Sequence, residues 1–203
     1  DIGANMGSFT IPLAFYNPQF NFVCFEPQRM VYYQLCGNIA LNSLKNVEAI
    51  KEALGEALGC GFIKTPDYSN EENIGAFSLD KEVREHDDYL CKTSGEEELI
   101  RICTLDNYNF HQVKLIKIDV EGMELSVLKG GIETIKRNKY PPIMFEAWTS
   151  KEWFLPKRKE LMEFLEDLGY EITNIGDDNI AVYKGEVKCV KKKCRLFLLL
   201  RQC

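Results

Sequence analysis

The sequence predicts an α/β fold in which helices cover both faces of a mainly parallel β-sheet. Strand-like apolar runs alternate with helix-like amphipathic runs over most of the 203 residues, and such alternation is typical of parallel sheets. With 45% hydrophobic residues, the chain is long enough to bury one domain-sized core and short for two. Two strand-like runs split by Asp177 and Asp178 predict a closing hairpin, which would add an antiparallel edge.

The predicted strands are short runs of consecutive apolar residues. The opening stretch DIGANMGSF begins on the last residues of a strand, because Asp1 and Ile2 lead directly into a turn that contains Gly3 and Gly7. Ordered structure is also expected from LIRICTLDNY, Leu99–Tyr108, onward. The other predicted strands are Asn21–Pro27, Asn46–Leu54, Val113–Gly122 and Pro141–Trp148.

The predicted helices have apolar residues at helical spacing. A short one includes Phe9, Ile11, Leu13 and Ala14 and ends at Asn17-Pro18. In the second, the apolar positions include Met30, Tyr33, Leu35, Ile39 and Leu41. The longer helices are expected at Gln28–Asn42, Met123–Asn138 and Pro156–Leu168.

The segment from Gly59 to about Arg101 interrupts this alternation. It starts with a short apolar run and continues as polar, acidic sequence that includes SNEEN, REHDD and GEEE. We expect a hairpin or excursion with long loops here. A solvated surface insert is the simpler interpretation, and a lid over a binding site is the alternative.

Composition excludes several functional classes. A net charge of -6 gives no broad positive field for a nucleic-acid partner, so a small or neutral substrate is expected. The eight cysteines form no CxxC pair, and none stands at zinc-ligand spacing from His86 or His111, so we expect reduced cysteines and no structural zinc. The chain shows no signal peptide and no apolar run of about 18 residues, and a cytoplasmic location is expected.

Acidic residues follow the predicted strands. Asp1 precedes the glycine turn, Glu26 ends the second strand, Asp119 and Glu121 end the Val113–Gly122 strand, and Glu146 ends the next. A single acid at such a position is usually a helix cap or a solvated residue. Ligands of parallel sheets bind at the carboxyl ends of the strands, so several acids at that edge indicate a site.

The sequence between Gly7 and Glu26 has the length of one helix and one strand. This spacing places an acid beside the glycine turn. There its carboxylate could accept both hydroxyls of a ribose. The turn allows a ligand to approach the backbone, because glycine lacks a side chain and Asn5 tolerates unusual dihedral angles. The sequence therefore predicts a nucleoside-like cofactor, although the GxxxG spacing is not the GxGxxG of dinucleotide sites.

Five segments together, DIGANMGSF, FEP, TLDNY, LIKIDVEGMELSVLKGG and IMFEAW, resemble the FkbM family of S-adenosylmethionine-dependent methyltransferases. The resemblance covers residues 1–184. It implies a class I, Rossmann-like methyltransferase fold with a mainly parallel seven-stranded sheet, an antiparallel last strand and helices on both faces. It also implies O-methylation, commonly of sugar hydroxyls or natural-product scaffolds.

The resemblance also implies roles for particular residues. The glycine turn would hold the methionine end of the cofactor, Glu26 the ribose, and the end of the third strand the adenine. Asp119 would lie near the methionine amino group or the reaction centre. The implied cofactor-binding residues are Asp1, Gly3, Asn5, Gly7, Glu26, Glu52, Ala53 and Asp119.

Methyl transfer to a hydroxyl requires a base, because a protonated hydroxyl is a poor nucleophile. The candidates are Asp119, Glu121 and Glu146, although Glu121 could instead cap the following helix. Asp119 and Glu146 could alternatively bind a divalent cation, which is not favoured. Both histidines are weaker candidates, since His111 lies in a short connection and His86 in the acidic excursion.

Aromatic residues could contact the apolar face of a sugar ring or could belong to the core. These residues are Tyr68, Trp148, Trp153 and Phe154.

Residues 185–203 do not belong to the family pattern and combine lysines with a short apolar run and three cysteines. A packing or dimer-contact segment is at least as plausible there as a membrane-surface anchor or acylation site. Asp1 stands where the first strand should end. We therefore expect the natural chain to continue upstream. The upstream sequence would either complete this strand or form a larger, glycan-building polypeptide of which this domain is the C-terminal module.

The leading functional hypothesis is O-methylation of a glycan sugar, such as the deoxyhexoses rhamnose or fucose. A natural-product acceptor is one alternative, and a nicotinamide-dependent oxidoreductase on a similar sheet is another. A non-catalytic cofactor-binding or scaffold module is disfavoured, because Asp119, Glu121 and Glu146 accompany an intact glycine turn.

Overall fold

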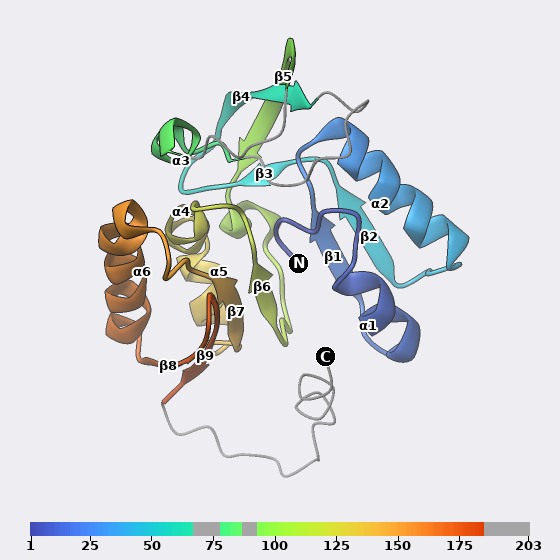
Figure 1. Cartoon of the computed structure of the whole chain (residues 1–203). Coiled ribbons are helices and arrows are strands. Elements are labelled where there is room, and N and C mark those ends of the chain that lie inside the picture. The colour runs from blue at the N-terminus through green and yellow to red at the C-terminus, as the bar shows by residue number, and fades with distance from the viewer. Residues whose placement is uncertain (67–77, 87–92, 185–203) are drawn as a thin grey trace.

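The computed structural model describes residues 1–66, 78–86 and 93–184 (Figure 1). Tyr68 and the tail at 185–203 therefore lie outside the described residues. The helices are α1 Thr10–Tyr16, α2 Arg29–Leu41, α3 Lys81–His86, α4 Glu124–Lys129, α5 Ile132–Arg137 and α6 Leu155–Asp167, with 3-10 turns η1 Leu105–Tyr108 and η2 Glu152–Phe154. The strands are β1 Phe22–Phe25, β2 Val47–Ile50, β3 Ala53–Leu54, β4 Gly59–Pro66, β5 Thr93–Cys103, β6 Ile116–Ile118, β7 Ile143–Glu146, β8 Tyr170–Ile175 and β9 Asp178–Tyr183.

Two groups of strands meet at the start of the chain. β1 and β2 form a parallel pair, and β6, β7, β9 and β8 form a second group in that order. Ile2 makes parallel bridges to Phe25 of β1 and to Ile118 of β6. This single residue therefore occupies the position between the two groups.

The closing hairpin is confirmed. β8 pairs antiparallel with β9 through Ile175 and Asp178, which leaves the two-residue turn Gly176-Asp177. β9 also pairs antiparallel with β7 through four residue pairs, while β6 and β7 are parallel. A mixed α/β arrangement with an antiparallel last strand results.

The structure does not show the expected clean, mainly parallel seven-stranded sheet, because Ile2 alone links the two strand groups, the second group is mixed, and three further strands form a sheet of their own. The predicted strand Asn46–Leu54 divides at Lys51-Glu52: β2 pairs with β1, whereas β3 pairs with β5. β5 also pairs antiparallel with β4 and forms a three-stranded sheet. The hairpin predicted after Gly59 is thus confirmed, and Figure 1 shows it with α3 at one end of the molecule.

The predicted helix Met123–Asn138 is two helices, α4 and α5, separated by Gly130 and Gly131. A Cβ atom at Gly130 would lie 1.9 Å from the carbonyl oxygen of Gly55, so the backbone approaches another segment closely at this point. The predictions for α2 and α6 agree with the structure to within one or two residues. In α2, however, only Val31 and Leu35 are buried, while Tyr33 and Leu41 are exposed.

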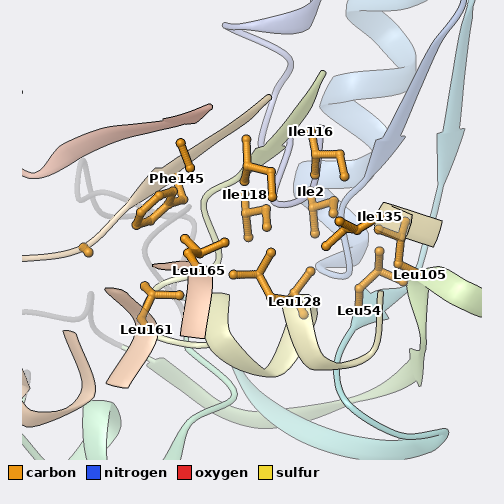
Figure 2. Packing of buried hydrophobic residues seen from close by; sticks show 14 of the residues in the cluster. Ile2, Leu54, Leu105, Ile116, Ile118, Leu128, Ile135, Phe145, Leu161 and Leu165 are labelled. Carbon is orange, nitrogen blue, oxygen red and sulfur yellow. The ribbon is translucent and has the colours of Figure 1, made fainter. Parts of the chain in front are cut away.

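The main hydrophobic core lies between the second strand group and helices α4, α5 and α6 (Figure 2). Ile118 and Phe145 come from β6 and β7, Leu128 from α4, and Leu161 and Leu165 from α6, with Ile2 contributing from the start of the chain. In Figure 2 these side chains point toward one another. The core therefore includes the residue that joins the two strand groups.

Substitution Leu165→Ala is expected to lower the free energy of unfolding by about 2–5 kcal/mol, because it leaves a cavity at a fully buried position. Leu155→Ala on the same helix, where the side chain is 45% exposed, should cost about 1 kcal/mol or less. Urea unfolding of both variants measures the difference. Equal losses would contradict this assignment of the core.

Candidate functional site

A cleft lies where β1 and β6 end, at the edge where ligands of parallel strands bind. Its lining includes seven of the residues predicted for cofactor or catalytic roles from the sequence. These seven are Gly3, Asn5, Glu26, Glu52, Ala53, Asp119 and Glu121. The structure therefore brings together most of the acids that follow the predicted strands.

The glycine turn packs directly against the segment that carries Asp119. The N–H groups of Gly3 and Ala4 both donate to the carbonyl oxygen of Phe25, and the Asp119 N–H donates to the Ile2 carbonyl at 2.9 Å. Gly3 has φ +76°, and a Cβ there would lie 1.8 Å from the Asp119 carbonyl oxygen. Only glycine fits this close approach, so the turn and the Asp119 backbone form one rigid floor of the cleft.

Glu26 is the most buried acid of the cleft lining, with 6% of its surface exposed. One carboxylate oxygen accepts the Asn5 N–H at 3.0 Å and the other accepts the Gln28 N–H at 2.9 Å. Burial raises the pKa of Glu26 to about 7 despite these two hydrogen bonds. At neutral pH this group is therefore close to half-ionised, and a donor arriving in the cleft would favour the charged form.

Gln28 lies beside Glu26 and also lines the cleft. Its side chain is 4% exposed, and its amide oxygen has no hydrogen-bond partner among the described residues. A buried acceptor without a partner is costly, so this oxygen is suited to a donor from a bound molecule. Sequence reasoning missed Gln28, because a glutamine after a strand has no distinctive pattern.

Two residues of the predicted cofactor set do not line the cleft. The Asp1 carboxylate accepts the Thr10 hydroxyl at 2.7 Å and lies 3.3 Å from the Lys117 amine. Gly7, at φ +92°, is packed so closely that a Cβ would lie 2.7 Å from Ile11. In this structure Asp1 and Gly7 therefore support the turn, and the cleft is lined by Gly3 and Asn5.

Glu52 and Ala53, which are expected to lie against the adenine of the cofactor, both line the cleft, although Ala53 belongs to the three-stranded sheet. The Glu52 carboxylate accepts the Tyr108 hydroxyl and lies 3.2 Å from Arg101. Tyr108 in turn packs its ring on Phe25 of β1. These contacts hold the Glu52 side chain in place in the cleft wall.

Asp119, Glu121 and Glu146 form an acid cluster, since one carboxylate oxygen of each lies within 4.8 Å of the other two. Glu146 does not line the cleft but joins the cluster from the end of β7, where it accepts the Trp148 indole N–H at 3.1 Å. Burial, with the charge of Asp119, raises the pKa of Glu146. Such a cluster suits a general base or a divalent cation, the two alternatives that the sequence left open.

Lys117 is a site residue that sequence reasoning missed. Its amine donates to Asp119 at 3.1 Å and lies 3.3 Å from Asp1, so it links the acid cluster to the start of the chain. The period-2 pattern of β6 puts Lys117 on the face opposite to the buried Ile116 and Ile118. That alternation was the available signal, but it did not reveal which acids the lysine would meet.

The described part of the excursion contributes to the cleft and so differs from the solvated insert expected there, whereas the SNEEN stretch lies outside the described residues. Ile63 of β4 and Leu79, which precedes α3, both line the cleft. Val83 of α3 is fully buried and packs so closely on Gly122 that a Cβ there would lie 2.7 Å from it. The described part of the excursion is therefore a wall of the site.

Helix α3 is attached to α6 by charged side chains. Lys157 donates to Asp80 at 2.7 Å and lies 2.9 Å from Glu82, and Asp80 also accepts the N–H groups of Glu82 and Val83 at the start of α3. His86 at the end of α3 stacks on Trp153, with ring centroids 4.8 Å apart. These contacts hold α3 across the aromatic segment that follows β7.

The predicted aromatic residues differ in exposure. Trp148 and Phe154 are buried in the main core, whereas Trp153 is half-buried and carries the His86 ring on one side. The Lys151 amine lies 3.4 Å from the centre of the Trp148 ring. Of the described aromatic candidates, Trp153 is thus the most exposed, and His111 is exposed in a connection.

The sequence also gives expectations for the cysteines and for membrane-spanning segments. The four described cysteines, Cys24, Cys36, Cys60 and Cys103, are free thiols, in agreement with the reduced state expected for them. Among the described helices, none has the length and apolar character needed to cross a bilayer.

Comparison with known proteins gives a consistent result. The family model for the methyltransferase FkbM domain matches residues 1–172. Methyltransferase sdnD of Sordaria araneosa is 28% identical over an alignment of 204 residues. The alignment covers 85% of this chain and 73% of that protein.

Two solved structures share the fold. An FkbM methyltransferase from Methylobacillus flagellatus KT has a TM-score of 0.57 at 19% identity, with 90% of this chain and 42% of that chain covered. A precorrin-6y C5,15-methyltransferase from Geobacter metallireducens GS-15 has a TM-score of 0.51 at 15% identity, with 90% and 78% covered. The chain therefore spans less than half of the first of these structures.

Substitution Lys157→Ala is expected to release α3 from α6. Loss of two partly buried ion pairs, at about 1 kcal/mol in total, should make amide exchange in α3 about fivefold faster. Lys159→Ala is the matched control, because Lys159 is exposed on the same helix and pairs only with Glu163 among the described residues, at 3.6 Å. Hydrogen-exchange mass spectrometry measures both, and equal rates in the two variants would show that Lys157 does not hold α3.

Proposed function

Because the chain belongs to the FkbM methyltransferase family, we propose that it binds S-adenosylmethionine in the cleft beside Glu26 and methylates a hydroxyl oxygen held at the acid cluster. The observation that carries this proposal is the arrangement of Glu26 and Asp119 in one cleft, on either side of the close-packed turn at Gly3. The family match favours methyl transfer over the nicotinamide-dependent oxidation that a similar sheet would allow.

The cleft residues fit the nucleoside part of this cofactor. Glu26 is a buried carboxylate whose ionised form would be stabilised by the two hydroxyls of a ribose. The unpartnered amide oxygen of Gln28 offers a further acceptor in the same cleft. Apolar side chains, including Leu54, Ile63 and Leu79, line the cleft and suit a flat base.

When bound, S-adenosylmethionine supplies an electrophilic methyl group on a positively charged sulfur. The protein must then hold an acceptor oxygen in line with that methyl and remove its proton. Asp119 and Glu121 reach both the cleft and the acid cluster. One carboxylate of the cluster takes the hydroxyl proton, and its neighbours keep the local potential negative, which also favours a cationic methyl donor.

A sugar hydroxyl is the acceptor class we propose, with a small natural-product hydroxyl as the alternative. The partly exposed Trp153 ring near the acid cluster supports a sugar, because an aromatic face packs well on the apolar face of a pyranose. The net charge of -6 supports a neutral acceptor rather than a phosphorylated one. A 6-deoxyhexose, which has a methyl group in place of the hydroxymethyl group of a hexose, matches this combination of aromatic and acidic groups.

Binding of S-adenosylhomocysteine tests the cofactor assignment. Glu26→Ala should weaken its binding by about 10- to 100-fold, because the ribose loses a charged acceptor. Glu48→Ala, on an exposed position of β2, should leave the Kd unchanged. Calorimetric titration measures both, and NADH serves as the comparison ligand. Equal affinity of the Glu26→Ala variant and the parent protein would refute the proposed position of the ribose.

The same titration should depend on pH. A ribose would favour ionised Glu26, so binding releases a proton and weakens as pH falls through about 7. The fall in the ionised fraction predicts about tenfold weaker binding at pH 6 than at pH 8. Glu26→Ala should lack this slope. An unchanged slope in that variant would mean that a group other than Glu26 is responsible.

Methyl transfer to a panel of rhamnosides, fucosides and phenolic or alcoholic natural products tests the acceptor. The variants Asp119→Asn, Glu121→Gln and Glu146→Gln should each lower kcat, and the one that removes the base should lower it by about 10²–10⁴-fold. Product analysis by mass spectrometry and NMR locates the methyl group. A chelator that abolishes activity would identify the acid cluster as a cation site instead, and methyl transfer to carbon or nitrogen alone would contradict O-methylation.

A further inference from the structure

The loop that carries two of the three clustered acids has an unfavourable backbone conformation. It runs from Asp119 to Gly122, between β6 and α4. Glu121 has φ +53° and Gly122 has φ +93°, so both lie in the left-handed region that L-residues other than glycine rarely adopt. A glutamate with this conformation requires support from its surroundings.

Glu124 provides that support from inside the protein. One oxygen of its carboxyl group accepts the N–H of Val120 at 3.1 Å and the N–H of Gly122 at 3.2 Å. The side chain is only 2% exposed. These two hydrogen bonds hold the amides on either side of Glu121, so they define the curvature of the loop at the residue whose φ is positive.

The opposite side of the loop is closed by packing. The position of a Cβ on Gly122 is blocked by Val83 of α3 at 2.7 Å and approached by Phe154 and Trp148 at 3.5 and 3.6 Å. The loop therefore lies between a buried hydrogen-bond acceptor and an apolar wall. Removing the acceptor would free the two amides while the wall remains.

On the basis of the proposed function, we propose that Glu124 is a positioning residue that holds the Asp119–Gly122 loop in the shape needed to place Asp119 and Glu121 for methyl transfer. Glu124 does not line the cleft, and it is not a member of the acid cluster. It acts through the backbone of Val120 and Gly122. The residue needs an oxygen acceptor at this position and does not need a negative charge.

The chemistry of Glu124 agrees with a role as an acceptor. Burial raises its pKa to about 8, and the charge of Glu146 contributes in the same direction. At neutral pH the group is therefore mostly protonated, and it accepts hydrogen bonds through its carbonyl oxygen. A glutamine side chain has the same oxygen and nearly the same volume, whereas methionine has the volume without the oxygen.

The experiment compares Glu124→Gln, Glu124→Met and the exposed control Glu163→Ala. We expect Glu124→Met to increase amide exchange at residues 120–122 by at least tenfold and to lower kcat by about 10- to 100-fold with a smaller change in the acceptor KM. Glu124→Gln should restore both values to within about threefold of the parent protein. Glu163→Ala should change neither, because its side chain is exposed on α6.

Other outcomes would overturn the proposal. Equal loss of kcat in the Gln and Met variants would make Glu124 an acid or base in its own right. Exchange at 120–122 unchanged in the Met variant would show that the loop does not depend on this acceptor. If the Met variant does not fold, the Gln variant decides alone: kcat and exchange near those of the parent support the proposal, and loss of either one contradicts it.

The amide-exchange measurement requires no cofactor or acceptor. If the parent protein fails to bind S-adenosylhomocysteine, the proposed function fails, while the exchange rates still show whether Glu124 shapes the loop. If the parent binds and methylates an acceptor but the exchange rates of the Glu124 variants are unchanged, only the positioning role fails.

Discussion

The site depends on the pairing of the first three residues with strands on both sides. The Ile2 N–H donates to the Lys117 carbonyl and its carbonyl accepts the Asp119 N–H, while Asp1 and Gly3 exchange hydrogen bonds with Phe25. This short segment joins the β1–β2 pair to the β6–β7–β9–β8 group. It also brings the end of β1, with Glu26, next to the end of β6, with Asp119. Without this segment, the part of the cleft that carries Glu26 would not be held in a fixed position relative to the part that carries Asp119.

The acids around the cleft have different environments, and this separates their chemical roles. Glu26 and Glu124 are almost completely buried, and burial raises the pKa of each. Glu26 faces the cleft, where ligand donors would compensate for burial, whereas Glu124 is compensated by backbone amides. Asp119 is more exposed, and its carboxylate lies 3.1 Å from the Lys117 amine. Similar carboxyl groups can therefore hold a ligand, shape a loop or take part in proton transfer.

Sequence reasoning located the parts of the site that belong to strand ends. An acid that follows a buried strand of a parallel sheet lies at the ligand edge, so Glu26, Asp119, Glu121 and Glu146 were found from position alone. The division of Asn46–Leu54 into two strands was not predicted, because an apolar run carries no signal for a change of sheet. The break at Gly130-Gly131 is equally hidden, since the cause is the distant Gly55 carbonyl.

Residues that act through distant contacts were missed for the same reason. Gln28, Lys117 and Glu124 look like ordinary polar positions, and their importance arises only from what they meet after folding. The excursion was interpreted as a solvated insert because its composition is mainly polar and acidic. For the described part of the excursion this interpretation was wrong. A few apolar positions, Ile63, Leu79 and Val83, were enough to attach it to the cleft and to the core.

These differences explain why the methyl donor was easier to predict than the acceptor. The proposed donor region is made by the glycine turn and strand ends, which have fixed spacings in the sequence. The proposed acceptor region combines the acid cluster with α3 and the segment around Trp153, which are joined by Lys157 and by the stacking of His86 on Trp153. Those contacts connect residues more than 65 positions apart. In the proposed function, acceptor choice would therefore depend on how the excursion packs, a property that local sequence patterns do not encode.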